Sequence, residues 1–173
     1  SRASGMILPP GSAGGNRIMN NYIGVSANGD SARGNGGNGI FIDSPNNLIG
    51  DSVPAARNII SGNNFPDIAI TGSGATGNTV RGNYIGTDSS GTFGYFVGAT
   101  HGVFMGSGAS HNTIGGTFTG SKNVISGHNS PGILLSDPLT SDNTIQGNYI
   151  GTSWFGWSKI GNGNGIRVTR GAS

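Results

Sequence analysis

The phrase GNYIGT occurs at residues 82–87 and again at residues 147–152, with a looser copy, NNYIGV, at residues 20–25. Tyr149 follows Tyr84 by 65 residues (149 − 84), and other phrases return with the same offset. Recurrence at a fixed period of this order is the sequence signature of repeat architectures. The repeat therefore decides the fold class before any single motif is considered.

A shorter repeat lies inside the long one. An apolar triplet is followed by an Asn-Thr-Ile-like segment and then by an Asn-Tyr-Ile- or Asn-Val-Ile-like segment, all within about thirty residues. The triplets stand at residues 6–8, 40–42, 68–70, 103–105, 133–135 and 166–168. The basic unit is thus three short strands, and two alternating versions of it make the longer repeat.

Strands of three residues separated by Gly, Asn and Ser turns cannot fold alone, so each unit must bury its apolar side against its neighbours. Stacked in parallel with three strands per turn, the units form three sheets. The sequence therefore predicts an all-β fold, a right-handed parallel β-helix (solenoid) of about five turns of three short strands. A single domain over residues 1–173 is expected.

Composition narrows the alternatives. Glycine accounts for 35 of the 173 residues, yet the formal charge is only +2 and Ile, Val, Thr and Tyr recur at fixed places, which argues against disorder. The absence of cysteine excludes disulfides and Cys-based metal sites. Without a Lys/Arg run or a long apolar span, neither nucleic-acid binding nor membrane insertion is expected, and no cofactor or metal site is predicted.

Residues that recur at the same position of every turn form a column, and each column predicts where its side chains point. Because side chains alternate along a strand, the outer residues of each triplet face the core, from Ile40 and Ile42 through to Ile166 and Val168. Asparagines recur just before the Ile positions of the other two segments, and stacked amides can hydrogen-bond along the axis. Two asparagine ladders are therefore expected, at residues 16, 47, 78, 112 and 143 and at residues 21, 58, 83, 123 and 148.

The remaining positions form two outward columns that are largely apolar. One contains the triplet centres, including Phe41 and Phe104, and the other contains Tyr22, Tyr84 and Tyr149. Monomers seldom leave such stripes bare. Either the long loops fold back over them, or they contact another chain or a bound polymer.

Aromatic residues also gather in the loops that follow GNYIG: Phe93, Tyr95, Phe96, Trp154, Phe155 and Trp157. Such rings suit stacking on sugars or docking of a subunit, and packing within the loops themselves is the third interpretation. All eleven of these column and loop aromatics are candidate contact residues for a second copy or a polysaccharide.

The sequence predicts no catalytic residue. Glycoside hydrolysis needs two facing carboxylates, and none of the seven Asp residues stacks on another Asp in the expected register. His111 and Asp142 precede ladder asparagines of adjacent turns and should pair, and a surface ion pair is the expected reading.

The phrases NTIGG (112–116), NVISG (123–127) and GNYIGTD (82–88) resemble repeats of the pectin-lyase-like superfamily of parallel β-helix proteins. More narrowly, they are similar to Gly/Asn-rich repeats of secreted bacterial surface proteins. The resemblance implies an extracellular or cell-surface location. It carries no catalytic set, because the row of acidic Ca²⁺ ligands that the lyases combine with a nearby Arg or Lys is not visible in this sequence.

The expected function is a non-catalytic structural or adhesive module. Because neither end carries a recognisable cap, a fragment of a longer solenoid or end-to-end or lateral association into a fibre is expected. The alternative is a fragment of a carbohydrate-active enzyme, either a polysaccharide lyase or a glycoside hydrolase, or a carbohydrate-binding module.

Overall fold

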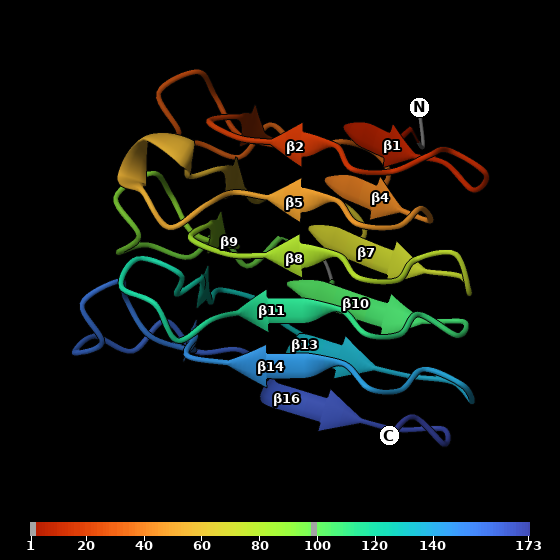
Figure 1. Ribbon diagram of the computed structural model, residues 1–173. Coiled ribbons are helices and arrows are strands. Elements are labelled where there is room, and N and C mark those ends of the chain that lie inside the picture. The colour runs from red at the N-terminus through yellow and green to blue at the C-terminus, as the bar shows by residue number, and fades with distance from the viewer. Residues whose placement is uncertain (1–2, 98–99) are drawn as a thin grey trace.

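A computed structural model describes residues 3–97 and 100–173 of the chain. Its strands form three parallel sheets, and the chain visits each sheet once per turn, so that successive turns stack along one axis (Figure 1). The predicted all-β solenoid of about five turns with three short strands each is confirmed. The described helical content is one 3₁₀ turn, η1 (Pro54–Ala56), and nothing in that part of the chain could cross a membrane as a helix.

The sheets are named A, B and C in the order in which the chain meets them. Sheet A contains β1 (Met6–Leu8), β4 (Ile40–Ile42), β7 (Ile68–Thr71), β10 (Val103–Gly106), β13 (Pro131–Leu135) and β16 (Asn164–Val168). Sheet B contains β2 (Arg17–Ile18), β5 (Leu48–Ile49), β8 (Thr79–Val80), β11 (Thr113–Gly115) and β14 (Thr144–Gln146). Sheet C contains β3 (Tyr22–Ile23), β6 (Ile59–Ile60), β9 (Tyr84–Ile85), β12 (Val124–Ile125) and β15 (Tyr149–Ile150).

The core is a narrow column of aliphatic side chains between the sheets. In sheet A, Ile40 pairs in register with Ile68, which pairs with Val103, and all three are fully buried. The equivalent positions of sheets B and C are buried in the same way, as Ile49 and Ile60 show. Inward and outward side chains alternate in the same way in every turn, so aliphatic residues stack on aliphatic residues. This stacking confirms the predicted core.

The assignment of Ile166 and Val168 to the core is wrong. Both side chains are about half exposed, at 47% and 55%. Their strand β16 pairs with β13 on one side, and within the described chain no further turn covers its other side. An inward-facing position is buried only when a turn lies above and below it.

Both predicted asparagine ladders are present. In the ladder beside sheet B, the Asn78 amide donates to Asn112 Oδ1 at 2.9 Å, and the Asn78 backbone N–H donates to the same oxygen at 2.9 Å. In the ladder beside sheet C, Asn83 Nδ2 donates to Asn123 Oδ1 at 3.1 Å. The ladders satisfy backbone groups that the tight bends leave without a sheet partner.

Three loops cover the outer face of sheet C. These flap loops, residues 25–32, 87–94 and 152–159, follow β3, β9 and β15 and are each closed by an antiparallel bridge. They stack on one another, since Ser89 N–H donates to Gly29 O at 2.9 Å and Trp154 N–H donates to Gly91 O at 3.0 Å. The outward residues of sheet C beneath them, Ile59, Tyr84 and Val124, are buried.

Candidate functional site

The outer face of sheet A is the apolar column that the flap loops do not cover. Its outward residues stand in register from strand to strand, with Phe41 beside Ala69 and Ala69 beside Phe104. Phe41 and Phe104 are partly exposed. An uncovered apolar stripe is the feature of a monomer surface that most often marks a contact site.

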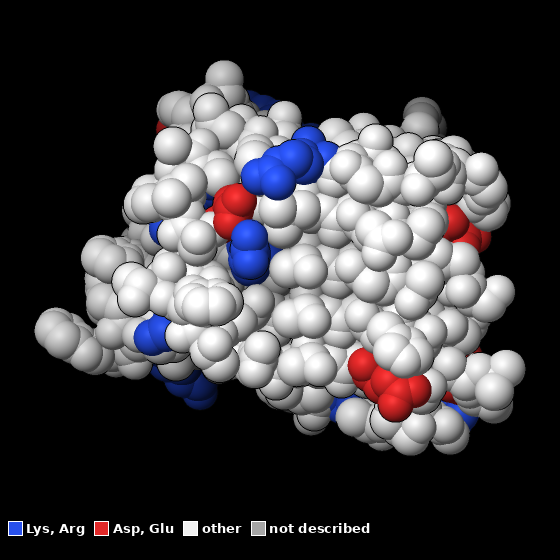
Figure 2. Space-filling view, in the orientation of Figure 1, with Lys and Arg blue, Asp and Glu red and all other residues white. Residues whose placement is uncertain are grey.

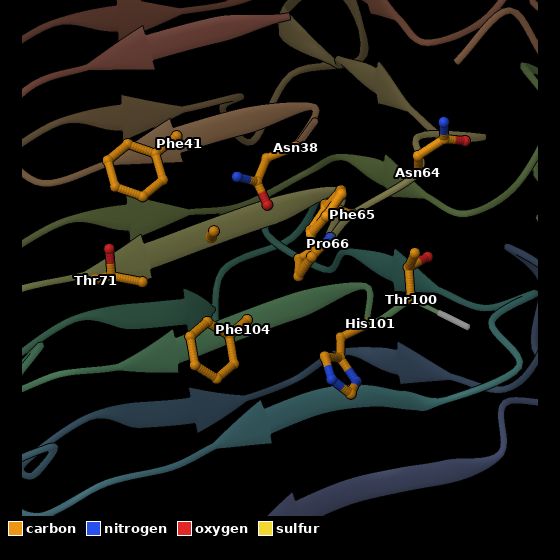
Figure 3. Close-up of a pocket in the computed structure, with 10 residues that line it drawn as sticks. Asn38, Phe41, Asn64, Phe65, Pro66, Thr71, Thr100, His101 and Phe104 are labelled. Carbon is orange, nitrogen blue, oxygen red and sulfur yellow. The ribbon is translucent and has the colours of Figure 1, made fainter. Parts of the chain in front are cut away.

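A groove of about 480 Å³ lies on this face, between the rings of Phe41 and Phe104 (Figure 3). Ala69 forms its floor, because the small side chain of β7 leaves a gap between two large neighbours. With neighbouring strands about 4.8 Å apart, the two Phe positions are separated by roughly 10 Å along the axis. We call this hollow the aromatic groove.

The bends that lead into sheet A supply the other walls. Phe65, which is 49% exposed, and Pro66 precede β7, and His101 precedes β10. The His101 ring stacks on Phe104, with centroids 6.3 Å apart and planes 26° apart. The polar lining consists of Asn38, Asn64, Thr71, Thr100 and His101. Aromatic surface with a few hydrogen-bonding groups is the usual make-up of a small-ligand site.

The aromatic groove carries no formal charge, since Asp, Glu, Lys and Arg are missing from its lining residues. Charged side chains are also sparse on the face of the molecule that Figure 2 displays. The two facing carboxylates needed for glycoside hydrolysis are thus not part of this groove. Its chemistry is that of stacking and hydrogen bonding.

A third column of polar side chains lies at the corner between sheets C and A. Its residues are not asparagine in every turn. Asn35 donates to Asn63 Oδ1 at 2.8 Å, as in the other ladders. In the next turn the corresponding residue is Val97, because Gly94 holds the loop position of Ala32 and Lys159, and a valine side chain has no amide to continue the ladder. His128 fills the gap from the turn below, and its Nε2 lies 3.0 Å from Asp67 Oδ2. This pair is 3% and 2% exposed.

The hydrogen bonds around His128 fix the position of its ring. Asn162 Oδ1 lies 3.1 Å from His128 Nδ1 and accepts the backbone N–H of the same histidine, while Asn162 Nδ2 donates to Ile125 O. The amide orientation is therefore set, and Nδ1 faces an acceptor. Nε2 faces the Asp67 carboxyl group, whose other oxygen accepts the Asn63 amide at 2.8 Å. A buried, hydrogen-bonded His–Asp pair thus lies in the corner that leads into sheet A.

The predicted aromatic residues of the loops do not join the aromatic groove. Trp154, Phe155 and Trp157 contact one another at the tip of the last flap loop, where Trp157 is 90% exposed. Phe93 packs edge-on against Tyr95, and Tyr95 donates its hydroxyl to Gly29 O at 2.9 Å. These contacts hold the loops together while leaving several rings at the surface.

The tyrosines of the GNYIGT column lie beneath the flap loops to different extents. Tyr22 is 44% exposed, whereas Tyr84 is 5% exposed, with the Arg57 guanidinium 4.1 Å from its ring centroid. Burial raises the pKa of the Tyr84 phenol. Tyr149 is partly buried, with Lys122 Nζ 4.6 Å from its ring centroid. For Tyr84 in particular, no ring face is left for a ligand.

The charged residues are mostly engaged in local contacts. The predicted pair of His111 and Asp142 is confirmed at 4.0 Å, with both side chains about two-thirds exposed. Asp51 contacts both Arg17 and Arg81. Among residues 3–97 and 100–173, no group of three or more His, Cys, Asp or Glu could hold a metal ion.

Sequence reasoning named Phe41 and Phe104 but missed Phe65, His101 and the buried pair of Asp67 and His128. The small residue at position 69 between two Phe in one column is the signal that could have located the groove. Neither the family models nor the curated proteins nor the solved structures that were compared with the chain gave a match.

Proposed function

We propose that this chain is a non-catalytic adhesive β-solenoid module that binds polysaccharide in the aromatic groove of sheet A. The observation that carries the proposal is the alternation of partly exposed Phe41, buried Ala69 and partly exposed Phe104 in a column that lies outside the flap loops. It creates two ring platforms with a gap between them. The C–H faces of sugar rings stack on such platforms, and the amides and hydroxyls around them suit sugar hydroxyl groups.

The proposed site suits a linear ligand that runs along the solenoid axis, across the strands. A rigid scaffold of paired strands holds the two platforms at a fixed separation, so little freedom is lost in the protein when a ligand binds. Adhesion to a polysaccharide implies an extracellular or cell-surface location, which belongs to the same proposal.

Filling the groove tests this function. Ala69→Phe would place a third ring between the two platforms without touching the core, because the side chain points outward. Native affinity electrophoresis through gels containing xylan, glucomannan, mixed-linkage β-glucan or homogalacturonan measures binding. We expect at least one polysaccharide to retard the wild-type chain and the variant to lose at least about tenfold in affinity, the equivalent of about 1.4 kcal/mol.

The matched control is Thr113→Phe, which adds a ring at an outward position of sheet B. It should bind like the wild type, and both variants should keep the wild-type circular dichroism spectrum. Equal retardation of the Ala69→Phe variant and the wild type would refute the groove as the site. Loss of concentration-dependent dimers in that variant, with no retardation of the wild type by any polysaccharide, would assign the groove to lateral self-association instead.

A further inference from the structure

His101 lies between two neighbouring hollows on the outer face of sheet A, so a ligand that runs along the solenoid axis would pass over it. Its ring lines the aromatic groove and also a second hollow of about 340 Å³, whose other lining residues include Phe104, Leu134 and Arg167. The stacked rings of His101 and Phe104 thus form the ridge between the two hollows. Figure 3 shows the His101 ring beside Phe104 at the edge of the groove.

The surroundings of this imidazole favour its neutral form. Within the described chain, Nδ1 is buried and has no hydrogen-bond partner. Burial is the main cause that lowers the pKa of His101, the interactions with His128 and Arg167 lower it further, and a hydrogen bond to the Pro131 carbonyl acts in the opposite direction. An imidazolium at this position would lose solvation, and the Pro131 carbonyl offsets only part of that loss, since the net shift of the pKa is downward.

The neighbouring acidic groups cannot serve as its counter-ion. Asp67, whose backbone N–H donates to the His101 carbonyl oxygen at 3.1 Å, has its carboxylate bound to His128. Asp137, which lines the second hollow, lies 3.9 Å from Arg170. The titratable and charged groups around His101 on the adjoining turns are therefore the Asp67–His128 pair, Arg167, and Asp137 with its partner Arg170.

We propose that His101 is a contact residue of one binding site extending over both hollows, and that the site holds its ligand only while the imidazole is uncharged. This inference rests on the proposed polysaccharide function. A sugar ring seated on the ridge removes the water that remains over His101, which makes the charged form still less favourable. Binding is therefore linked to the release of a proton from His101.

The sign of the pH dependence follows from this linkage. Above the pKa of His101 in the free protein the ring is already neutral, so the affinity does not change with pH. Below it, a proton must leave before the ligand binds, and the affinity falls by up to about tenfold per pH unit. Because the pKa of His101 is lowered from its usual value near 6.5, the fall should begin below about pH 6.5.

Affinity electrophoresis of the wild-type chain from pH 4 to pH 8, in gels containing the four polysaccharides named above, tests this inference. We expect constant retardation at neutral pH and, once the pH falls below the pKa of His101, a loss of affinity that approaches about tenfold per pH unit. His101→Phe keeps an aromatic ridge without a titrating group, so this variant should bind at pH 8 and keep its affinity at pH 4. His111→Phe, which removes an exposed histidine elsewhere, should retain the wild-type pH profile.

The outcomes separate the two proposals. Equal wild-type affinity at pH 4 and pH 8, or a pH profile that survives in His101→Phe, would overturn the role of His101 and leave the polysaccharide function standing. A wild-type chain that none of the four polysaccharides retards at any pH would overturn both. Tryptophan fluorescence at each pH confirms that the compared proteins remain folded.

Discussion

At the scale of the residue, buried asparagine side chains supply hydrogen bonds between turns that such short strands cannot supply. Asn83 shows this most clearly: its amide donates to Ile49 O at 2.8 Å and to Asn123 Oδ1, and its oxygen accepts the amide of Asn58 at 2.9 Å. It is fully buried. One side chain therefore links three turns and satisfies polar groups that no water reaches.

Replacing Asn83 by Leu should destabilise the protein by about 3 kcal/mol or more. The change leaves the Asn58 amide and the Ile49 carbonyl buried without one of their partners, at about 1–3 kcal/mol each. Urea unfolding followed by circular dichroism measures the loss. Asn64→Leu, at an exposed position of the same residue type, should stay within about 0.5 kcal/mol of the wild type. Equal unfolding midpoints for the Asn83 variant and the wild type would show that the ladder is not what holds the bends.

At the scale of the element, the flap loops explain why the repeat is two turns long. Loops occur on alternate turns, after β3, β9 and β15, and each hydrogen-bonds directly to the next. Turns without a loop, those of β6 and β12, present Ile59 and Val124, which the neighbouring loops cover. A folded-back loop is thicker than one strand spacing, so a loop on every turn would not fit.

A pair of matched glycine variants tests this packing. Gly91 and Gly156 hold corresponding loop positions with φ of 67° and 81°, so alanine at either suffers the same backbone strain, about 1 kcal/mol. A Cβ on Gly91 would lie 2.7 Å from the Tyr84 ring, whereas a Cβ on Gly156 would lie 3.7 Å from Tyr149. Gly91→Ala should therefore lower the free energy of unfolding by roughly 1–3 kcal/mol more than Gly156→Ala. Identical losses, measured by urea unfolding, would mean that the loop does not press on the tyrosine.

At the scale of the whole molecule, the three outer faces differ in what they leave free. Sheet C is covered by its own loops, and sheet B presents a largely polar column containing Thr79, Thr113 and Thr144. Sheet A combines an apolar column with the aromatic groove of about 480 Å³. The faces are held to one axis by contacts between turns, and the charged cluster of Arg17, Asp51 and Arg81 is one such contact at the surface.

Because of this cluster, the free energy of unfolding should depend on pH in the acidic range. The backbone N–H of Ser52 holds the pKa of Asp51 below its usual value, and the guanidinium groups of Arg81 and Arg17 add to the effect. A lowered carboxyl pKa stabilises the fold above the unfolded-state pKa of about 3.9, and this stabilisation is lost as pH falls through the lower folded-state pKa.

Asp51→Asn should therefore cost about 0.5–1 kcal/mol at pH 7, the range of a well-formed surface ion pair. The cost should shrink as pH falls through the lowered pKa of Asp51, because the wild-type carboxyl group then loses its charge. Urea midpoints at pH 7, 4 and 2 measure it, and Asp142→Asn, which removes an exposed carboxylate, should show a smaller difference at pH 7. A cost that stays constant down to pH 2 would contradict an ionic origin.

Much of this architecture could be predicted because the repeat enforces it. A stacked turn places each residue on its counterpart one turn away, so column membership alone assigned Ile40 to the core, Asn83 to a ladder and His111 to Asp142. Column membership failed for Ile166 and Val168, because burial also requires a turn on both sides. It also left open which apolar column the loops would cover.

By itself, then, the sequence determined the solenoid, its three short strands per turn, its core and its asparagine ladders, since these depend on local alternation and on the register between neighbouring turns. The tertiary structure alone decided that the loops cover sheet C and leave the groove of sheet A open. It also revealed that His128 reaches across a turn to Asp67 and that His101 lies on Phe104. These features depend on contacts between residues at different positions of different turns. Such contacts cannot be predicted from residues that recur at one position of the repeat.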